Sequence, residues 1–230
     1  MGYVAYTGSI GVLVNAGPTA GRALFPNDFN GAFSVDTVFG LITIVTGVVG
    51  TAGGGVALDR LVPSMFGAMA MSAVCVAVAT ILFIITFQMR SLGWFIFLFL
   101  LAELALFAVS GVINAGYMWS VPRELRPLAC AIVTVAIHLL GDVPSPPLAG
   151  LLVDRLKETH DEAAAWVITM TVCFGGIGVA ALFWGIAAVF SRTEVDYGQK
   201  NVAERLSIDG DALLLNTHME EDDESPIHGE

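Results

Sequence analysis

The chain has 230 residues, of which 56% are hydrophobic and 13% are charged, and its mean hydropathy is +0.76. Because an average soluble domain has about 25% charged residues, this chain has too few polar side chains to cover a soluble core. Its formal net charge of -11 excludes nucleic acid as a partner, since nucleic-acid-binding domains are basic. The composition therefore predicts an all-α membrane protein whose immediate partner is the lipid bilayer.

A helix that spans a bilayer needs roughly 20 consecutive, mostly apolar residues. The sequence offers six such candidates in chain order, at about residues 3–17, 35–58, 65–89, 94–121, 128–153 and 164–190. The first is short and starts without a polar flank, which suggests a longer parent protein. We therefore predict that residues 1–190 form a six-helix transmembrane bundle.

The last forty residues differ in composition from the rest. Residues 191–230 contain eleven acidic and three basic side chains, which predicts an acidic, disordered tail. If the tail is cytosolic, six basic residues lie inside and four outside, in line with the positive-inside rule. Asp209 followed by Leu213-Leu214 is typical of an acidic dileucine sorting signal, although such short patterns also occur in plain disordered tails.

One sequence string occurs twice. Residues 55–61 read Gly, three apolar residues, Asp, Arg, Leu, and residues 150–156 repeat this pattern 95 positions later. Each copy closes the second helix of a three-helix unit, and three crossings separate them, so they lie on opposite sides of the membrane. This arrangement predicts a 3+3 inverted repeat, as in each half of major facilitator transporters.

The first copy is a candidate gate. Gly55 would allow close helix approach, and Asp59 with Arg60 could form a pair that stabilises one conformation of a moving bundle. The alternative is a plain turn in which the aspartate caps the next helix and the arginine reaches toward the interface. The second copy, at Asp154 and Arg155, is the weaker candidate because it lies on the other side of the membrane.

The fifth candidate span contains ionisable residues. His138 and Asp142 are four positions apart and so share one helical face. Ionisable residues at this depth are costly and suggest a functional site. Pro144, Pro146 and Pro147 are expected to break the helix, which is tolerated where the backbone faces protein or a water-filled cavity. The alternative is a structural His–Asp pair at a kink.

Glu103 lies near the middle of the fourth candidate span, and its polar face continues through Ser110 and Asn114. Such a stripe should face the bundle interior, where Glu103 could carry a proton or bind the polar part of a substrate. Alternatively, a protonated Glu103 could simply hydrogen-bond a neighbouring helix.

Other chemistry has little support. A zinc site needs three or four protein ligands, and the remaining histidines lie in a loop and in the tail, so we expect neither a metal nor a cofactor. An intramembrane hydrolase would rest on His138 and Asp142 alone.

The stretch from residue 121 to 154 resembles the spinster family of the major facilitator superfamily, and plant-type members regarded as sphingolipid transporters are the most similar. The residues that carry the resemblance are Val121–Pro127, Ala129, Ala131, His138–Asp142, Ser145-Pro146, Gly150 and Asp154. Looser matches are Gly17-Pro18, Gly21, Phe39-Gly40 and Gly54–Arg60.

This resemblance implies the C-terminal half, helices seven to twelve, of a secondary transporter for sphingolipids or lysophospholipids in an endosomal, lysosomal or vacuolar membrane. Some members of the family are thought to use protons. The resemblance adds Arg123 and Arg126 to the candidate gate. The substrate of such a transporter lies between two halves, so this chain would need its N-terminal half or another chain. The alternative is a non-transporting membrane subunit that pairs with another transporter chain.

Overall fold

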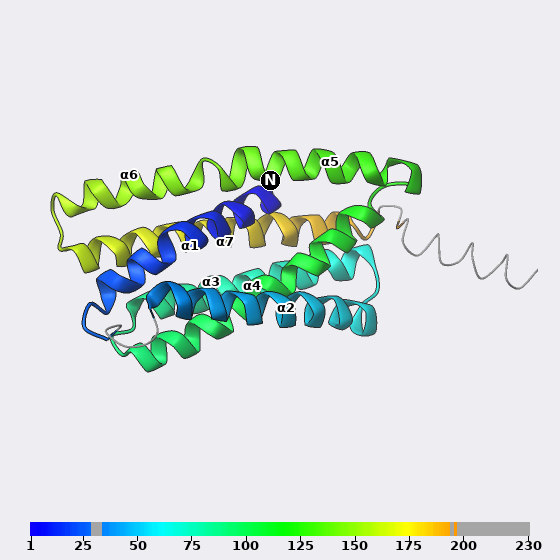
Figure 1. Cartoon of the computed structure of the whole chain (residues 1–230). Coiled ribbons are helices and arrows are strands. Elements are labelled where there is room, and N and C mark those ends of the chain that lie inside the picture. Colours follow the sequence, from blue (N-terminus) through cyan, green and yellow to red (C-terminus); the bar gives the residue numbers. More distant parts are fainter. Residues whose placement is uncertain (29–33, 194–195, 197–230) are drawn as a thin grey trace, which may run out of the picture.

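The computed structural model describes residues 1–28, 34–193 and 196, and within this part of the chain all regular secondary structure is helical. Figure 1 shows the helices running alternately toward and away from the end where α7 stops, which we call the tail side. In chain order the elements are α1 (Gly2–Leu24), α2 (Val35–Leu61), α3 (Met65–Gln88), α4 (Leu92–Trp119), η1 (Arg123–Leu125), α5 (Arg126–Ile137), η2 (His138–Asp142), α6 (Ser145–Lys157) and α7 (Glu162–Phe190).

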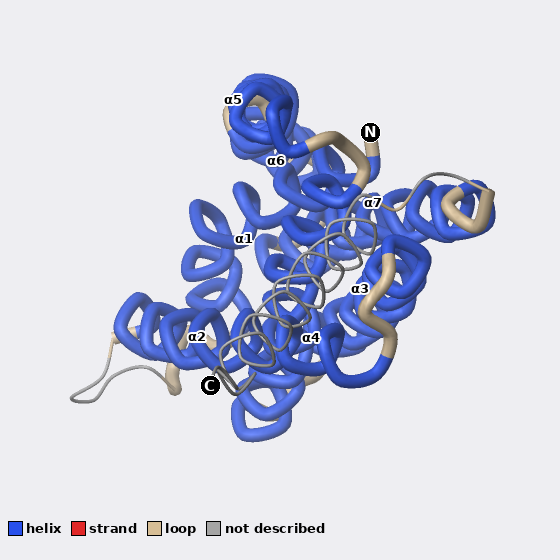
Figure 2. The backbone as a smooth tube through the Cα atoms, turned by 90° about the vertical axis from the view of Figure 1, so that its right-hand side faces the viewer, coloured by secondary structure: helices blue, strands red, loops and turns tan. Residues whose placement is uncertain are grey.

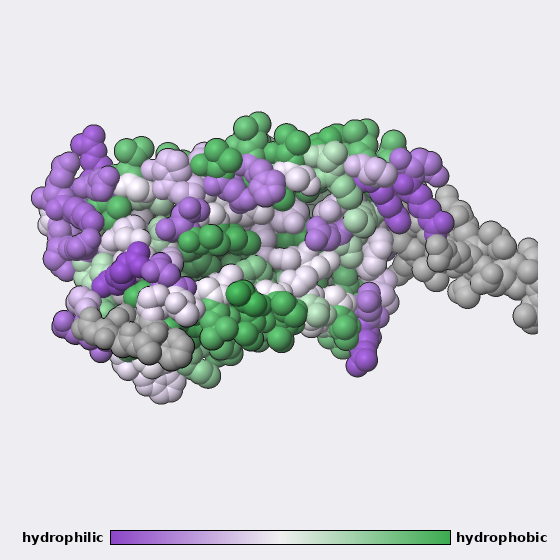
Figure 3. All heavy atoms as spheres, viewed as in Figure 1, coloured by the Kyte–Doolittle hydropathy of each residue, from purple (hydrophilic) through white to green (hydrophobic). Residues whose placement is uncertain are grey.

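Five helical stretches of the described chain are long and apolar enough to cross a membrane: α2, α3, α4, the run from Arg123 to Lys157, and α7. Their outward-facing side chains are mostly aliphatic, for example Ile44, Val48 and Leu182, which are 66%, 69% and 69% exposed. Figure 3 shows that hydrophilic residues gather toward the two ends of the molecule, with apolar surface between them. The chain is therefore an all-α, multi-pass integral membrane protein.

The first helix is longer than the expected range of 3–17. α1 continues through Pro18 to Leu24, so the proline does not end it. It falls short of the apolar criterion for a span because small and polar residues occur along its whole length. Arg22 in its last turn bonds Asp36 of α2 at 2.7 Å, which joins the end of α1 to the start of the next helix.

Polar caps explain where three helices begin. The Ser34 hydroxyl accepts a hydrogen bond from the backbone N–H of Thr37, and the Ser64 hydroxyl accepts one from that of Gly67. Asp161 does the same for Ala164 at the start of α7. Each cap satisfies a backbone donor that has no partner within the helix, and the helices begin within a few residues of the expected positions.

The packing of the helices follows a paired pattern. α3 packs along both α4 and α7; α2 packs on α4, and α1 packs on α7, η2 and α6. At the centre, aromatic rings of α3, α4 and α7 stack, with the Phe83 and Phe174 centroids 4.2 Å apart. Figure 2, turned by 90°, shows α5 at the edge of the bundle, and α5 has no buried residue.

The fifth span crosses as one stretch from Arg123 to Lys157, but its regular α-helix is interrupted at residues 138–144, where the prolines were expected to break it. α5 passes into η2, a single π-helical turn closed by the Val143 N–H donating to the His138 carbonyl at 3.1 Å. α6 then begins at Ser145, so Pro146 and Pro147 occupy its first turn. Backbone N–H groups have no intrahelical partner there, and proline is harmless for that reason.

Candidate functional site

The His138–Asp142 pair lies on η2, in the middle of the fifth span. The His138 Nδ1 and Asp142 Oδ2 atoms are 2.6 Å apart, and their side chains are 59% and 31% exposed. The other oxygen, Asp142 Oδ1, is enclosed and has no hydrogen-bond partner among the described residues. The site therefore combines an exposed imidazole with a carboxylate that can still accept a hydrogen bond.

Backbone contact with α1 fixes the position of this π turn. A Cβ atom at Gly141 would lie 2.5 Å from the Thr7 Oγ1 and 2.8 Å from the Val4 carbonyl oxygen. On the α1 side, a Cβ at Gly11 would lie 3.1 Å from the Asp142 carbonyl oxygen. Glycine at both positions lets the two helices touch, and the Thr7 hydroxyl lies 3.3 Å from the Ile137 carbonyl oxygen. The turn that carries His138 is thus pinned against α1.

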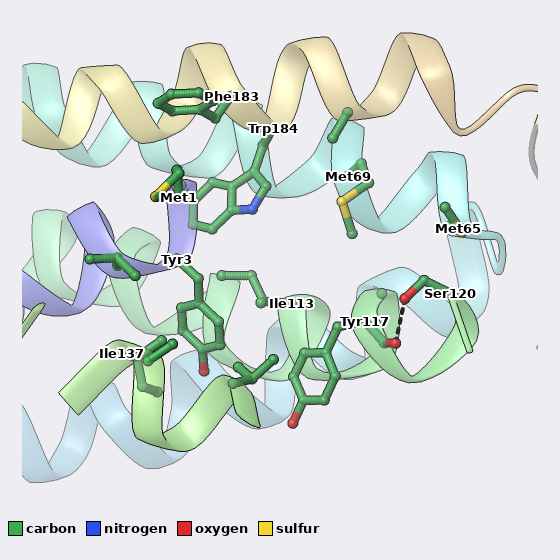
Figure 4. Close-up of a pocket in the computed structure, with 16 residues that line it drawn as sticks. Met1, Tyr3, Met65, Met69, Ile113, Tyr117, Ser120, Ile137, Phe183 and Trp184 are labelled. Atoms are coloured by element: carbon green, nitrogen blue, oxygen red, sulfur yellow. Dashed lines mark hydrogen bonds between the residues drawn. The ribbon is translucent and has the colours of Figure 1, made fainter. Parts of the chain in front are cut away.

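A cavity of about 410 Å³ lies beside the pair, between α1, α3, α4, α5 and α7 (Figure 4). Most of its wall is apolar, with Met69, Ile113 and Phe183 among the lining residues. Figure 4 shows the hydroxyl groups of Tyr3 and Tyr117 pointing away from Trp184. Neither His138 nor Asp142 lines the cavity, but their neighbour Ile137 does. An apolar chamber therefore adjoins a polar, ionisable turn.

Glu103 is in a different place from the pair. Its side chain is fully buried between α4 and α2, where the hydroxyls of Thr43 and Thr46 lie 2.9 Å from its two carboxyl oxygens. No basic residue forms an ion pair with it in the described chain. Glu103 thus forms a sealed contact between two helices.

The contacts of Glu103 accommodate an uncharged carboxyl group. The Thr46 hydroxyl has one hydrogen, yet it lies 2.7 Å from the Ile42 carbonyl oxygen and 2.9 Å from Glu103 Oε2. A carbonyl can only accept, so a Thr46 that donates to Ile42 needs a donor at Oε2. A protonated Glu103 satisfies every contact, and it also avoids an unpaired charge in a buried, apolar site.

The other polar residues of α4 contact different partners. The Ser110 hydroxyl lies 2.8 Å from the Tyr6 hydroxyl of α1, which also donates to the Leu106 carbonyl at 2.8 Å. Asn114 is half-buried one turn further along α4. The polar residues of α4 therefore face α2 at Glu103 and α1 at Ser110.

The candidate gate residues lie at the tail side. Asp59 and Arg60 are both exposed, and no ion pair joins them in the described chain. A Cβ at Gly55 would meet nothing within 4 Å, although a Cβ at Gly111 of α4 would lie 3.6 Å from the Gly55 backbone nitrogen; the tightest approach of the two helices lies elsewhere. It occurs one residue earlier, at Gly54, where the carbonyl of Ala108 occupies the space of a side chain.

The two arginines of the next tail-side loop differ in their contacts. Arg123 is exposed, whereas the Arg126 Nε donates to the Met118 carbonyl at 3.0 Å and so ties α5 to the end of α4. The second copy of the string ends at the opposite face, where Arg155 lies 3.9 Å from Glu158. The two copies are thus at opposite ends of the bundle, as Figure 1 shows for the ends of α2 and α6.

Several site residues were not found from the sequence. Thr43 and Thr46 contact Glu103, Tyr3 lines the cavity, and Thr7 contacts η2. Tyr6 contacts Ser110. All five are ordinary residues of apolar helices. The three-residue spacing of the two threonines is the one available hint, since it places both on one face. In the described residues, no group of three or more His, Cys, Asp or Glu side chains could hold a metal ion.

Comparison with known proteins gives the chain a family context, although no protein-family model matches it. The chain is 35% identical over 194 residues to "Probable sphingolipid transporter spinster homolog 2" of Arabidopsis thaliana, which covers 84% of this chain and 38% of the relative. It is 34% identical over 189 residues to spinster homolog 3 of the same plant, which covers 82% and 35%. The similarity extends to "Sphingosine-1-phosphate transporter SPNS2" of Danio rerio, at 28% identity over 177 residues, or 72% of this chain and 34% of the relative.

The chain thus spans a little over a third of the length of these relatives, while most of its own length is matched. Those proteins are named as transporters. Over most of its length, this chain is therefore homologous to proteins named as spinster-type probable sphingolipid transporters.

Proposed function

We propose that the chain is one six-helix unit, a 3+3 inverted repeat, of a two-unit secondary transporter for an amphipathic lipid, a sphingolipid or a lysophospholipid. The unit corresponds to the C-terminal half of a major facilitator fold, with residues 1–190 as the bundle and 191–230 as a cytosolic tail. Most of that tail lies outside the described residues. The names of the relatives supply the substrate class.

The helix contacts support the repeat. In the proposed repeat, α1 corresponds to α4, α2 to the fifth span, and α3 to α7. The contact of α2 with α4 then corresponds to the contact of the fifth span, through η2 and α6, with α1. In the same way, the α3–α4 contact corresponds to the α1–α7 contact, and the α3–α7 contact corresponds to itself. The same pairs of helices are thus in contact when the two triplets are interchanged, which supports an inverted repeat.

Residue positions support the repeat at the same offset as the Asp-Arg strings. Glu103 contacts Thr46, and the residues 95 positions away from these two are Gly8 and Gly141. Gly8 and Gly141 contact each other, since a Cβ at Gly8 would lie 3.5 Å from the Gly141 carbonyl oxygen. Thr43 and His138 are also 95 positions apart. Corresponding residues therefore meet at both helix crossings.

The observation that carries the two-unit proposal is the exposure of the His138–Asp142 pair. A hydrogen-bonded ionisable pair in the middle of a membrane span is costly in contact with lipid. Here the imidazole is 59% exposed, and α5, the helix before it, buries no side chain. This face needs a cover of protein or water, and a second six-helix unit enclosing a cavity provides both.

The same face suits an amphipathic substrate. The cavity offers apolar walls for a hydrocarbon chain, and the neighbouring pair offers a hydrogen-bonding, ionisable contact for a polar head. Histidine is also the side chain most able to change charge between about pH 5 and 8. We assign His138 and Asp142 to the substrate and proton pathway, Ser110 and Asn114 to its α4 wall, and Glu103 to the support of that wall.

The tail-side residues Gly55, Asp59, Arg60, Arg123 and Arg126 form the proposed gate, since they lie in the last turns of α2 and at the start of the fifth span, at the same end of the bundle. We place the transporter in an endosomal, lysosomal or vacuolar membrane. The acidic dileucine pattern at Asp209 and Leu213-Leu214 supports this placement, and it lies outside the described residues.

The test is lipid uptake by the assembled transporter, in which the chain is joined to its upstream six-helix region. We expect His138→Ala to reduce uptake of a fluorescent sphingoid lipid at least tenfold and to remove its dependence on pH. His160→Ala changes an exposed loop histidine and is the matched control, for which uptake should stay within twofold of the unmodified protein. Uptake by the His138 variant with an unchanged pH profile would refute the assigned role.

A further inference from the structure

The first residues after α7 contact the start of α3. The Met65 backbone N–H donates to Asp196 Oδ2 at 2.7 Å. Arg192 lies over the Phe66 ring, with 4.5 Å between the guanidinium carbon and the ring centre. Two side chains of the segment that leaves α7 thus bind two consecutive residues at the beginning of another helix.

The carboxylate contact is of a kind that stabilises a helix start. The first backbone N–H groups of a helix have no intrahelical acceptor, and a carboxylate there also interacts favourably with the helix dipole. The Ser64 hydroxyl accepts a hydrogen bond from the Gly67 N–H, and the Asp196 carboxylate accepts one from the Met65 N–H. The arginine adds a cation–π contact. Asp196 therefore completes a cap that the residues before α3 provide only in part.

The start of α3 is tightly coupled to the end of α2. Only residues 62–64 separate the two helices, and the Ser64 N–H donates to the Val62 carbonyl at 2.7 Å. A side chain at Gly67 would clash with that same carbonyl. Leu58 of α2 and Ala68 of α3 are buried together with Val112 of α4. The exposed Asp59 and Arg60 are thus attached to a compact turn that α3 holds in place.

We propose that Arg192 and Asp196 act as a strap that holds the α2–α3 turn, and with it Asp59 and Arg60, in the arrangement seen here. This inference rests on the proposed function for its transport consequence, since the strap would regulate the gate. The contact itself does not depend on transport. Releasing the strap loosens the first turn of α3 and lets the adjoining turn move.

Hydrogen–deuterium exchange on the whole chain in detergent micelles tests the strap. We expect Asp196→Ala to raise amide exchange in residues 62–69 about fivefold, as expected for the loss of a helix cap. The effect should extend to residues 55–61. Asp196→Asn keeps a hydrogen-bond acceptor and should give a smaller increase. Asp161→Ala removes the cap of α7 at the opposite end, and is expected to change exchange near residue 164 alone.

Each outcome decides a separate part of the proposal. Unchanged exchange in residues 62–69 of the Asp196→Ala variant would overturn the strap. A change confined to residues 65–69 would show a cap without coupling to Asp59 and Arg60, and would overturn regulation of the gate. If coupling is seen, uptake by the assembled Asp196→Ala transporter should change at least twofold, and uptake unchanged from the unmodified protein would likewise overturn regulation. If the unmodified assembly transports no lipid, the proposed function fails and the exchange data alone decide the strap.

Discussion

Three carboxylates of this chain, Glu103, Asp142 and Asp196, have different surroundings and therefore different chemistry. Glu103 is fully buried and contacts two threonine hydroxyls, which suits an uncharged acid. Asp142 is partly exposed and bonded to an imidazole. Asp196 accepts a backbone hydrogen bond at a helix start. Residue type alone does not separate these roles, because burial and the available donors set the charge state of each group.

Substitution of Glu103 tests its protonation. Because glutamine has the same shape and can both donate and accept, Glu103→Gln should lower the free energy of unfolding by less than about 1 kcal/mol, whereas Glu103→Ala should lower it by about 2–3 kcal/mol through lost hydrogen bonds and a cavity. Unfolding in mixed micelles gives both values. Equal destabilisation by the two variants would contradict an uncharged, hydrogen-bonding role for Glu103.

The sequence identifies Glu103 and His138 because charged or ionisable residues stand out in apolar segments. The residues that contact the polar side chains of α4 from other helices cannot be identified in this way. Thr43, Thr46 and Tyr6 are common in membrane helices, and no pattern in one sequence shows which helix they meet. The sequence places Glu103, Ser110 and Asn114 along one helix, but only the packed bundle shows that Glu103 contacts α2 while Ser110 contacts α1.

At the scale of helices, α2 and α4 touch through their backbones. A Cβ at Gly50 would lie 2.9 Å from the Leu104 carbonyl oxygen, and one at Gly54 would clash with Ala108. Such small residues let membrane helices approach closely. Gly40 and Gly47 belong to the same helix, but a Cβ at either position would meet nothing within 4 Å. The glycines of α2 therefore divide into a pair packed against α4, Gly50 and Gly54, and a pair in open space, Gly40 and Gly47.

Neighbouring glycines of α2 provide a matched pair of variants. Gly54→Ala should force α2 and α4 apart and lower the free energy of unfolding by about 1–3 kcal/mol. Gly53→Ala adds the same methyl group in open space. Because alanine has the higher helix propensity, the free energy of unfolding should stay unchanged or rise by up to about 1 kcal/mol. The same micelle unfolding assay compares them. Similar losses for both would contradict the backbone contact.

Helix positions follow from the sequence more readily than helix details. Apolar runs bounded by Ser64, Arg90 or Asp161 show clear starts and ends. The length of α1 was underestimated because its last turns hold polar residues and Pro18, yet a proline is tolerated there. The π turn at His138–Asp142 was missed because it depends on the contact of Gly141 with Thr7 and Val4, which local sequence does not report.

For the molecule as a whole, the two Asp-Arg strings mark opposite ends of the bundle. Arg60 lies at the tail side, where α2 ends, and Arg155 lies at the other end, where α6 ends. Both side chains are exposed, so they are accessible to reagents in water. This arrangement gives a direct test of the membrane topology.

Single cysteines at these two positions should label from opposite sides. In a background with Cys75, Cys130 and Cys173 replaced, Arg60→Cys should react with a membrane-impermeant maleimide from the cytosol alone, and Arg155→Cys from the opposite side alone. Labelling in intact and permeabilised cells distinguishes the two. Reaction of both cysteines from one side would contradict the fold's orientation in the membrane and the inverted repeat.

The π turn also bears on how this span could have arisen. A single π turn is what a regular α-helix becomes when one residue is inserted, and each residue of an α-helix turns the chain by about 100°. Deleting one residue between His138 and Asp142 would thus restore a plain helix but rotate α6 by that angle relative to α5. Ala149 and Val153, which are 2% and 3% exposed, would then turn from the bundle toward lipid. The extra residue therefore sets the rotation of α6 relative to α5. With this rotation, His138 stays exposed while Ala149 and Val153 pack into the bundle.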